Sequence, residues 1–437
     1  MTQVLTRFDV RGLSGAELRA RLPRPDPSGG EPVAAVQAIL ADVRSRGDEA
    51  VRECTERFDG VVVGDLAVPR SEWDAALARI APDLRAALGA AHESIEAYHR
   101  AQLPPNDHVV ERDGLVVRGV RRPVERVGCY VPGGRAVYPS TVLMTAVPAR
   151  VAGVDEVVLC VPPDRDGNVP GPVLAAAALA GVDEVYRIGG AQAIGALAYG
   201  TESVRPVDVI VGPGNVYVAV AKRLVAGEGL VGVPSSFTGP SEVIVVADDT
   251  TPPAYAAIDI VVQAEHGPGG LAWLVTWSED AADAIIAEVE RIVVAAPRRA
   301  DIEATLASGG YAALVDGREH AIAVSNLIAP EHLELLCDDP DSLVALVRHA
   351  GAVFCGPWAP ASIGDYIAGP SHVLPTFGSA RFGEALTVDD FVKHVHVITV
   401  DKAAFERVGP HVEAIAEAEG LAEHARSIAI RRDGGTR

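Results

Sequence analysis

The chain has 437 residues, with 38 Lys and Arg against 59 Asp and Glu, which gives a formal net charge of −21. This length predicts two or three domains with well-filled cores, and the acidic charge argues against binding to nucleic acids or anionic membranes. Hydrophobic residues make up 49% of the chain and aromatic residues only 5%, a composition that favours helices packed on sheets over an aromatic-rich β-sandwich.

The N-terminal stretch 1–15 lacks the apolar core of a secretory signal peptide, and no later stretch holds about 18 apolar residues without Pro, Gly or charge. We therefore expect a cytoplasmic protein. The cysteines are five in number, widely spaced and without a CxxC pair, which argues against a disulfide framework and a thiolate zinc site. Cys129, beside a glycine-rich stretch, is a candidate reactive thiol, although a free cysteine is more often a small buried hydrophobic side chain.

The first 130 residues are predicted to be mostly helical. In 31–60 and 71–102, apolar residues recur three and four positions apart, as on one face of a helix. The pair Pro104–Pro105 and the basic run 118–127 then mark a change in the pattern.

From residue 129 the chain alternates between short β-branched runs and helical patterns. Each run is too continuously apolar for a half-exposed strand, as expected of parallel strands buried on both faces. A strand, a glycine turn and a helix that repeat every 25–28 residues or so predict a Rossmann-like half. The runs are 154–161, 182–188 and 207–212, and the helical patterns are 171–181, 190–200 and 215–227.

The glycine fingerprint of dinucleotide-binding folds is incomplete. The stretch 212–217, GPGNVY, follows a predicted strand but has Tyr217 in place of the third glycine. A nucleotide can still be held at these strand ends, because the amides at helix N-termini attract anions. This motif alone leaves the question open.

A second α/β segment runs from 241–248 to about residue 385, and the tail 386–437 reads as helical. We therefore predict an α/β fold with two Rossmann-like, incomplete parallel-sheet domains and helical N- and C-terminal segments. The predicted domains are 1–128 with 237–385, then 129–236, and a C-terminal segment 386–437.

The sequence QAEHGPGG offers the first candidate metal ligands. In a helix Gln263 and His266 lie at i and i+3 and project from one face. Histidine is the commonest metal ligand, and an amide oxygen can complete the set. A helix C-terminus, where histidine favours the dipole and glycine ends the helix, explains the same residues without a metal.

The sequence APEHLEL offers two candidate bases. We predict that Pro330 begins a helix, with Glu331 and His332 in its first turn, where a histidine tends to be neutral and can serve as a base. Adjacent side chains on a helix point about 100° apart, so the pair is poorly placed to bind one ion together. Capping of the helix is the alternative explanation.

Two further pairs are candidates. Asp365 follows a glycine in a turn-like setting and is a possible oxygen ligand, although a turn aspartate commonly bonds its own backbone. His372 follows seven residues later, and Glu419 and His424 lie on a predicted C-terminal helix. Neither HExxH nor the full signature of zinc deaminases is present.

In chain order, eight motifs resemble those of the histidinol dehydrogenase family, and the resemblance extends over nearly the whole chain. They are GCYVPGGRAVYPSTVLM, IGGAQAIGALAYGT, VGPGNVYV, GPSEVIVVAD, QAEHGP, APEHLEL, GDYIAGPSHVLPT and EGLAEHARSIAIR.

The resemblance implies a zinc-dependent homodimer that oxidises L-histidinol to L-histidine with two NAD⁺, the last step of histidine biosynthesis. Glu331 and His332 match the family's two proton acceptors. Its zinc ligands match Gln263, His266, Asp365 and His424. Its substrate contacts match those ligands together with Ser241, His332, His372 and Glu419.

The resemblance also implies NAD contacts at Tyr130, Gln192 and Asn215, all at the glycine turns of 129–236. It implies that the segment 386–437 crosses into the partner subunit and completes the neighbouring active site. Two other functions stay open. One is an aldehyde dehydrogenase with Cys129 as nucleophile, and the other is a catalytically silent nucleotide-binding or assembly protein.

Overall fold

The structure is a computed structural model that describes residues 4–23, 32–104, 108–134, 136–234, 239–267, 269–432 and 434. Pro105, part of the predicted change in pattern, lies outside these residues. The chain divides into two compact units, one formed by 1–102 with 124–391 and the other by 103–123 with 392–437. Within the described ranges, no helix is both long and apolar enough to span a bilayer.

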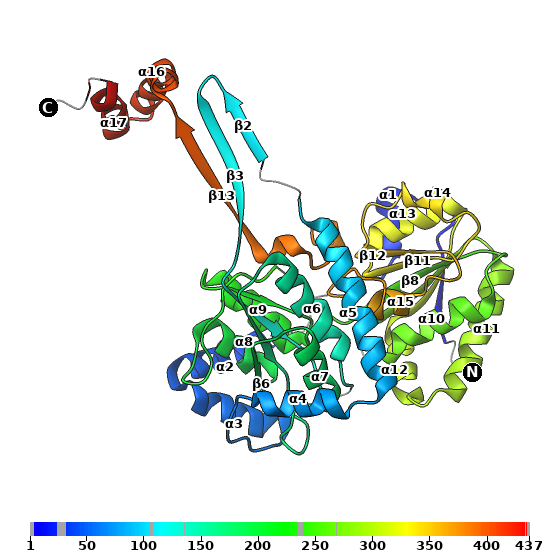
Figure 1. The fold of residues 1–437 in the computed structure, drawn as a ribbon. Coiled ribbons are helices and arrows are strands. Elements are labelled where there is room, and N and C mark those ends of the chain that lie inside the picture. The colour runs from blue at the N-terminus through cyan, green and yellow to red at the C-terminus, as the bar shows by residue number, and fades with distance from the viewer. Residues whose placement is uncertain are drawn as a thin grey trace. The chain divides into compact units, whose positions relative to one another are not determined.

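A six-stranded, all-parallel sheet forms one layer of the first unit (Figure 1). The two strands at its centre carry apolar side chains on both faces, as parallel strands buried on both sides require. Its order is β1 (Thr6–Asp9), β10 (Gly310–Leu314), β9 (Leu271–Thr276), β8 (Glu242–Ala247), β11 (His332–Leu335) and β12 (Ala352–Cys355).

Alternating residues of this sheet face two separate helical layers. Val243 and Val245 pack with α10 (Pro253–Glu265), α11 (Glu279–Ala295) and α12 (Arg299–Gly309). Ile244 and Val246 pack with α1 (Gly15–Arg21), α13 (Arg318–Ile328) and α14 (Asp341–Val344). The period of two along each strand therefore separates the two cores.

A four-stranded parallel sheet forms the other half of the first unit, and its parallel strands confirm the predicted Rossmann-like half. Its order is β6 (Glu184–Tyr186), β5 (Glu156–Cys160), β4 (Arg126–Tyr130) and β7 (Val209–Val211). One face is covered by α6 (Pro139–Ala152) and α7 (Gly171–Leu179), and the other by α8 (Gly190–Tyr199) and α9 (Val216–Gly227).

The predicted N-terminal helices are present, and they pack on this four-stranded sheet. α2 (Val33–Arg46) and α3 (Asp48–Asp59) join the core that contains α8 and α9. α4 (Arg70–Arg79) and α5 (Pro82–Gln102) join the core that contains α6 and α7. This packing differs from the predicted grouping of 1–128 with 237–385, because helix periodicity shows which face of a helix is apolar but not which sheet receives it.

The second unit adds a strand to the tail that was predicted to be helical. It contains an antiparallel sheet of order β13 (Val392–Val400), β3 (Leu115–Pro123) and β2 (His108–Arg112). α16 (Lys402–Ala418) and α17 (Ala422–Arg432) follow. The tail strand was missed because its partner β3 is about 270 residues earlier in the chain, beyond the reach of any local pattern.

Candidate active site

The segment that contains Glu331 and His332 is not the start of a helix, and that prediction is wrong. α13 ends at Ile328, and its C-cap residue Ala329 has a left-handed φ of 57°. Pro330 follows this helix end, where proline is common because it cannot continue the helix. His332 instead begins β11, which pairs with β8 on one side and β12 on the other. The imidazole of His332 therefore does not lie in the first turn of a helix, contrary to the prediction.

Glu331 is held in a buried polar pocket at the start of β11. Its Oε2 accepts a hydrogen bond from Ser241 Oγ at 2.6 Å and another from the Glu242 backbone N–H at 2.9 Å. Burial raises the pKa of Glu331, while the adjacent His332 and the two hydrogen bonds oppose that shift. A carboxyl group with a raised pKa is a stronger base than an exposed glutamate.

The His332 imidazole lies between two carboxyl groups. Its Nδ1 is 3.7 Å from Glu331 Oε2, its Nε2 is 3.7 Å from Asp365 Oδ1, and the residue is only 4% exposed. The ring of Phe354 lies 5.9 Å away, centroid to centroid. Among the described residues, Nδ1 has no hydrogen-bond partner. A buried imidazole nitrogen without a partner is suited to take a proton from a bound molecule.

Asp365 lies in a short helix, α15 (Ala361–Tyr366), and not in the predicted turn. Its backbone carbonyl accepts a hydrogen bond from His372 Nδ1 at 2.9 Å, so Nδ1 carries the proton. His372 Nε2 then accepts from Thr141 Oγ1 at 3.0 Å. Burial lowers the pKa of His372, which favours this neutral form. Both ring nitrogens are thus occupied, and a ligand would have to displace Thr141 to reach one.

Gln263 and His266 lie together at the end of α10, as the i and i+3 spacing predicted. His266 is the exposed C-cap residue, and Gln263 is buried. Ser241 Oγ is 3.2 Å from Gln263 Oε1 as well as 2.6 Å from Glu331 Oε2. One hydroxyl proton cannot serve both acceptors.

The opposite orientation of the Gln263 amide resolves this conflict. In that orientation Nε2 donates to Ser241 Oγ, and the Ser241 hydroxyl proton goes to Glu331. The carbonyl oxygen then occupies the position in which the side-chain atom of Gln263 has no hydrogen-bond partner. A buried amide oxygen without a partner is a suitable metal ligand. The donor set of two imidazoles, one carboxylate and one amide therefore fits a zinc ion.

The structure shows only part of the predicted zinc set in one place. Asp365 and His266 lie in the first unit, and both act electrostatically on His372. Glu419 and His424 belong to the second unit, where both are exposed. Within the described residues, no group of three or more His, Cys, Asp or Glu side chains is arranged to hold a metal.

A separate cavity of about 700 Å³ lies at the carboxyl ends of the four-stranded parallel sheet. This is the edge at which open α/β sheets bind their ligands. The predicted NAD contacts Tyr130, Gln192 and Asn215 all line it. They come from the end of β4, the first turn of α8 and the N-cap of α9.

The polar groups of this cavity are of two kinds. Tyr130 Oη accepts from the Gly190 N–H at 3.1 Å, and Asn215 Oδ1 caps α9 by accepting from Tyr217 N at 3.0 Å. The buried Gln192 amide has no hydrogen-bond partner on either atom among the described residues. Gln192 is therefore ready to bond a ligand, whereas the other two shape the wall.

The cavity also contains residues that the sequence did not reveal. Asp59 and Phe58, at the end of α3, and Arg165, after β5, line it. Burial raises the pKa of Asp59 to about 6. Asp59 and Phe58 were missed because α3 reaches this sheet only through tertiary packing, and an isolated Asp at a helix end carries no local signal of a binding site.

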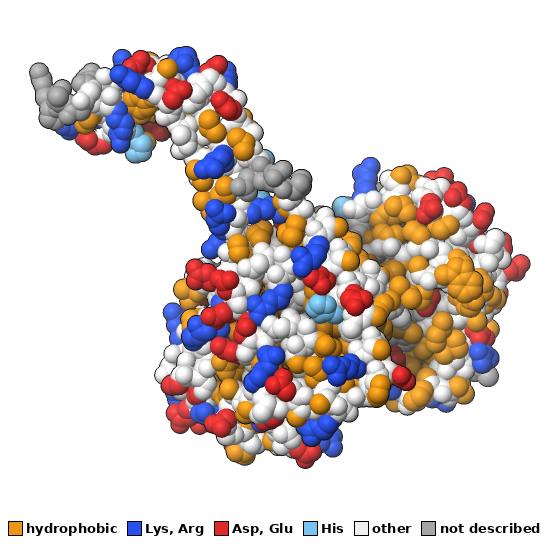
Figure 2. All heavy atoms as spheres, in the orientation of Figure 1, with side chains coloured by type: hydrophobic (Ala, Val, Ile, Leu, Met, Phe, Trp, Pro, Cys, Tyr) orange, Lys and Arg blue, Asp and Glu red, His pale blue; other side chains and the backbone are white. Residues whose placement is uncertain are grey.

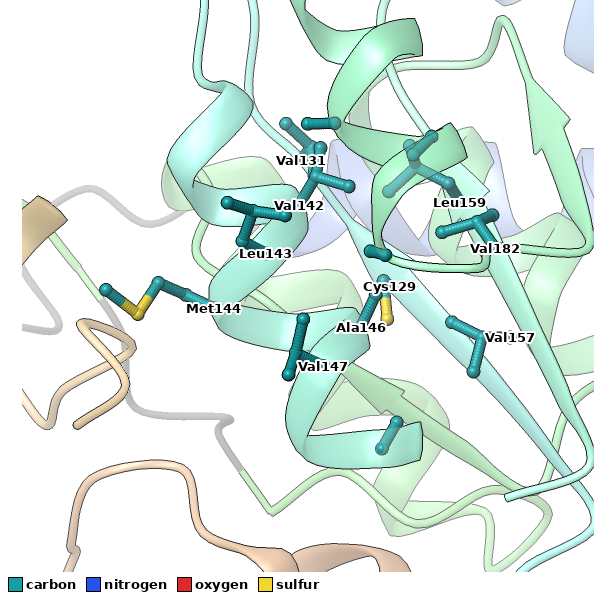
Figure 3. Close-up of a cluster of buried hydrophobic side chains, with 14 of the residues drawn as sticks. Cys129, Val131, Val142, Leu143, Met144, Ala146, Val147, Val157, Leu159 and Val182 are labelled. Atoms are coloured by element: carbon teal, nitrogen blue, oxygen red, sulfur yellow. The ribbon is translucent and has the colours of Figure 1, made fainter. Parts of the chain in front are cut away.

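Cys129 is a core residue. It lies in β4, fully buried among aliphatic side chains such as Val142, Ala146 and Leu159 (Figure 3). Burial raises the pKa of its thiol to about 12. Because the thiolate is the nucleophilic form, this environment argues against the aldehyde dehydrogenase alternative.

Comparison with known proteins identifies the family. A family model described as histidinol dehydrogenase matches residues 23–432. The histidinol dehydrogenase of Synechococcus sp. is 48% identical over 401 residues, covering 91% of this chain and 92% of that relative. The one from Methanothermobacter thermautotrophicus is 44% identical over 431 residues, covering 99% of both.

A solved structure agrees with these matches. The crystal structure of histidinol dehydrogenase from Elizabethkingia anophelis has 34% sequence identity, a TM-score of 0.92 and coverage of 99% of both chains. The family and the fold class predicted from the sequence are thus confirmed. The chain belongs to the histidinol dehydrogenase family of NAD-dependent oxidoreductases.

Proposed function

We propose that the chain oxidises L-histidinol through L-histidinal to L-histidine, reducing two NAD⁺, as the final step of histidine biosynthesis. The observation that carries the proposal is the buried pair Glu331 and His332, two potential bases whose side chains approach to 3.7 Å. The cavity of about 700 Å³ with its unpartnered Gln192 amide, lined by the predicted NAD contacts, supports it. Such a pair supplies one base for the substrate hydroxyl groups and a second base for the water that adds to the aldehyde. The cytoplasmic location stays a prediction.

In the first oxidation, His332 removes the hydroxyl proton of histidinol while the carbinol carbon loses hydride to NAD⁺. The products are the aldehyde, NADH and a protonated imidazole. His332 is suited to this step because Nδ1 has no competing partner among the described residues. The Asp365 carboxylate, 3.7 Å from Nε2, stabilises the positive charge that forms.

In the second oxidation, Glu331 accepts a proton from water as the water adds to the aldehyde carbon. The adduct is the monoanion of the diol. His332, having released its first proton to solvent, takes the remaining hydroxyl proton of this adduct while a second NAD⁺ receives hydride. The Ser241 and Glu242 hydrogen bonds keep the Glu331 carboxylate fixed at the strand start. The product is the carboxylate of histidine.

We propose that Gln263, His266, Asp365 and the partner subunit's His424 hold one zinc ion. Bound zinc would orient the substrate imidazole and amine and offset developing negative charge. Ser241, Glu419 and His372 are proposed to contact the substrate as well. For His372 this requires displacement of Thr141 from Nε2.

We propose a homodimer in which the C-terminal segment of one copy completes the active site of the other. Figure 2 shows hydrophobic side chains gathered over the part of the first unit that carries α10 and α15. Tyr255 and Ile258 of α10 are exposed, and the ring of Tyr255 lies 6.1 Å, centroid to centroid, from that of Trp358, which is 81% exposed. In the second unit, Ile398 and Ile415 are 65% and 61% exposed. Contiguous exposed apolar patches commonly mark surfaces that a partner covers.

The proposal predicts two NADH per L-histidinol at limiting substrate. Exhaustive chelation should abolish this turnover, and added zinc should restore it, because the proposed ligands include no thiolate to retain the metal. Absorbance of NADH against substrate consumed gives the ratio. One NADH per substrate, or full activity in metal-free protein, would contradict the proposal. NAD⁺ binding without any turnover would instead favour the silent binding protein.

Replacing the unpartnered amide of Gln192 should weaken NAD⁺ binding. Gln192→Ala is expected to raise KM for NAD⁺ about 5–20-fold, equivalent to the loss of one hydrogen bond of roughly 1–2 kcal/mol. We expect kcat to change little. Gln37→Ala, on the exposed face of α2, is the control, and an unchanged KM in Gln192→Ala would argue against this cavity as the NAD site.

A further inference from the structure

A buried carboxyl group with no assigned role lies two residues beyond His332. Glu334 is in β11 with 0% exposure, and strand alternation places it on the same sheet face as His332. Its neighbours Leu333 and Leu335 pack in the core on the other face. A fully buried glutamate requires polar partners that justify its burial.

The first partner of Glu334 is the start of α15. Its Oε1 accepts a hydrogen bond from the Ala361 backbone N–H at 2.7 Å. Ala361 is the first residue of α15, and the preceding Pro360 offers no side-chain cap. Glu334 therefore satisfies an otherwise unpaired N–H of the helix that carries Asp365.

The second partner is Asp259 on α10. Asp259 is one helical turn before Gln263, so the two side chains project from the same face. The Asp259 carboxyl is close enough to hydrogen-bond to that of Glu334. Two ionised carboxylates contain no donor, and Glu334 Oε2 has no other partner among the described residues. One proton must therefore lie between the two groups.

Glu334 is the better site for this proton, because it is fully buried whereas Asp259 is only partly buried. Burial raises the pKa of Glu334 well above its usual range, and the charge of Asp259 raises it further. As a neutral acid, Glu334 donates from Oε2 to Asp259 and accepts from Ala361 at Oε1. Both of its oxygens are then satisfied, and each bond reaches a different element.

We propose that Glu334 is a positioning residue that ties α10, β11 and α15 together, so that Gln263 and Asp365 keep the separation that a shared metal ion requires. The inference rests on the proposed zinc site. Outer partners that orient metal ligands commonly alter metal affinity by ~10–100-fold when they are removed. Glu334 would act through the two elements it joins, without touching the metal or the substrate.

The test is zinc affinity of the full-length metal-free protein, measured by competition with a chromophoric chelator. Glu334→Gln keeps one acceptor and one donor, and we expect wild-type affinity and KM for histidinol. Glu334→Leu removes both hydrogen bonds and should weaken zinc binding by ~10–100-fold and raise KM. Leu335→Met, on the opposite face of β11, is the packing control and should match the wild type.

Four outcomes would count against the inference. Equal losses in Glu334→Gln and Glu334→Leu would mean that a negative charge is required. Wild-type zinc affinity in Glu334→Leu would remove any positioning role. If Glu334→Leu does not fold, the double variant Glu334→Gln with Asp259→Asn replaces it, because this variant keeps a neutral donor and acceptor. It should bind zinc as the wild type does, and a loss of zinc binding in it would overturn the inference. A wild-type protein that binds no zinc would overturn the proposed function as well.

Discussion

His332→Asn is expected to lower kcat for both oxidations by roughly 10²–10⁴-fold, the usual contribution of a general base. The reason is that His332 takes the proton in each hydride transfer, and asparagine cannot accept one. The side chain is 5% exposed and lies 3.7 Å from both Glu331 and Asp365. Water therefore has little room to replace it.

The measurement is turnover from L-histidinol and, separately, from L-histidinal, each followed as NADH. Zinc affinity and the melting temperature of His332→Asn should stay close to the wild type, because His332 is not among the proposed ligands. His92→Asn, on α5 and remote from the site in sequence, is the matched control. Loss of only one of the two half-reactions would contradict a shared base.

Glu331→Gln is expected to separate the two oxidations. The first should stay within several-fold of the wild type, because the amide preserves the shape of the pocket and still accepts from the Glu242 N–H. The second should fall by about 10²–10³-fold, because no carboxylate remains to help water add to the aldehyde. Histidinal should accumulate, which trapping with an amine reagent would detect.

The pH dependence provides a further check on the same residue. Burial raises the pKa of Glu331, and the base must be ionised to act. The rate of histidinal oxidation should therefore rise with pH through a pKa above that of an ordinary glutamate. This acid limb of the pH–rate profile should be absent in Glu331→Gln. Equal loss of both oxidations, or an unchanged acid limb, would contradict the division of labour. Glu319→Gln on α13 is the control.

The sequence alone predicted the elements whose signal is local. The continuous β-branched runs at 154–161 and 207–212 are parallel strands, because a strand buried on both faces needs apolar side chains at every position. The spacing of Gln263 and His266 placed both at one end of α10, because three residues are nearly one helical turn. The motifs also sufficed for the family assignment.

Other features depended on partners that are distant in the chain. The segment after Pro330 is a strand because β8 and β12 supply its hydrogen bonds, although the proline suggested a helix start. β13 needs β3 for the same reason. Ordered pairing of this kind depends on residues separated by tens to hundreds of positions, which no local pattern contains.

The chemistry of the site was decided at the same tertiary level. The sequence shows that Glu331 and His332 are adjacent. Only the folded chain brings Ser241 into hydrogen-bond contact with Glu331 and places Asp365 beside His332. The burial that raises the pKa of Glu331 also comes from packing. Sequence therefore determined which side chains are available, and long-range contacts determined their environment, because pKa values and hydrogen bonds depend on every group that packs nearby.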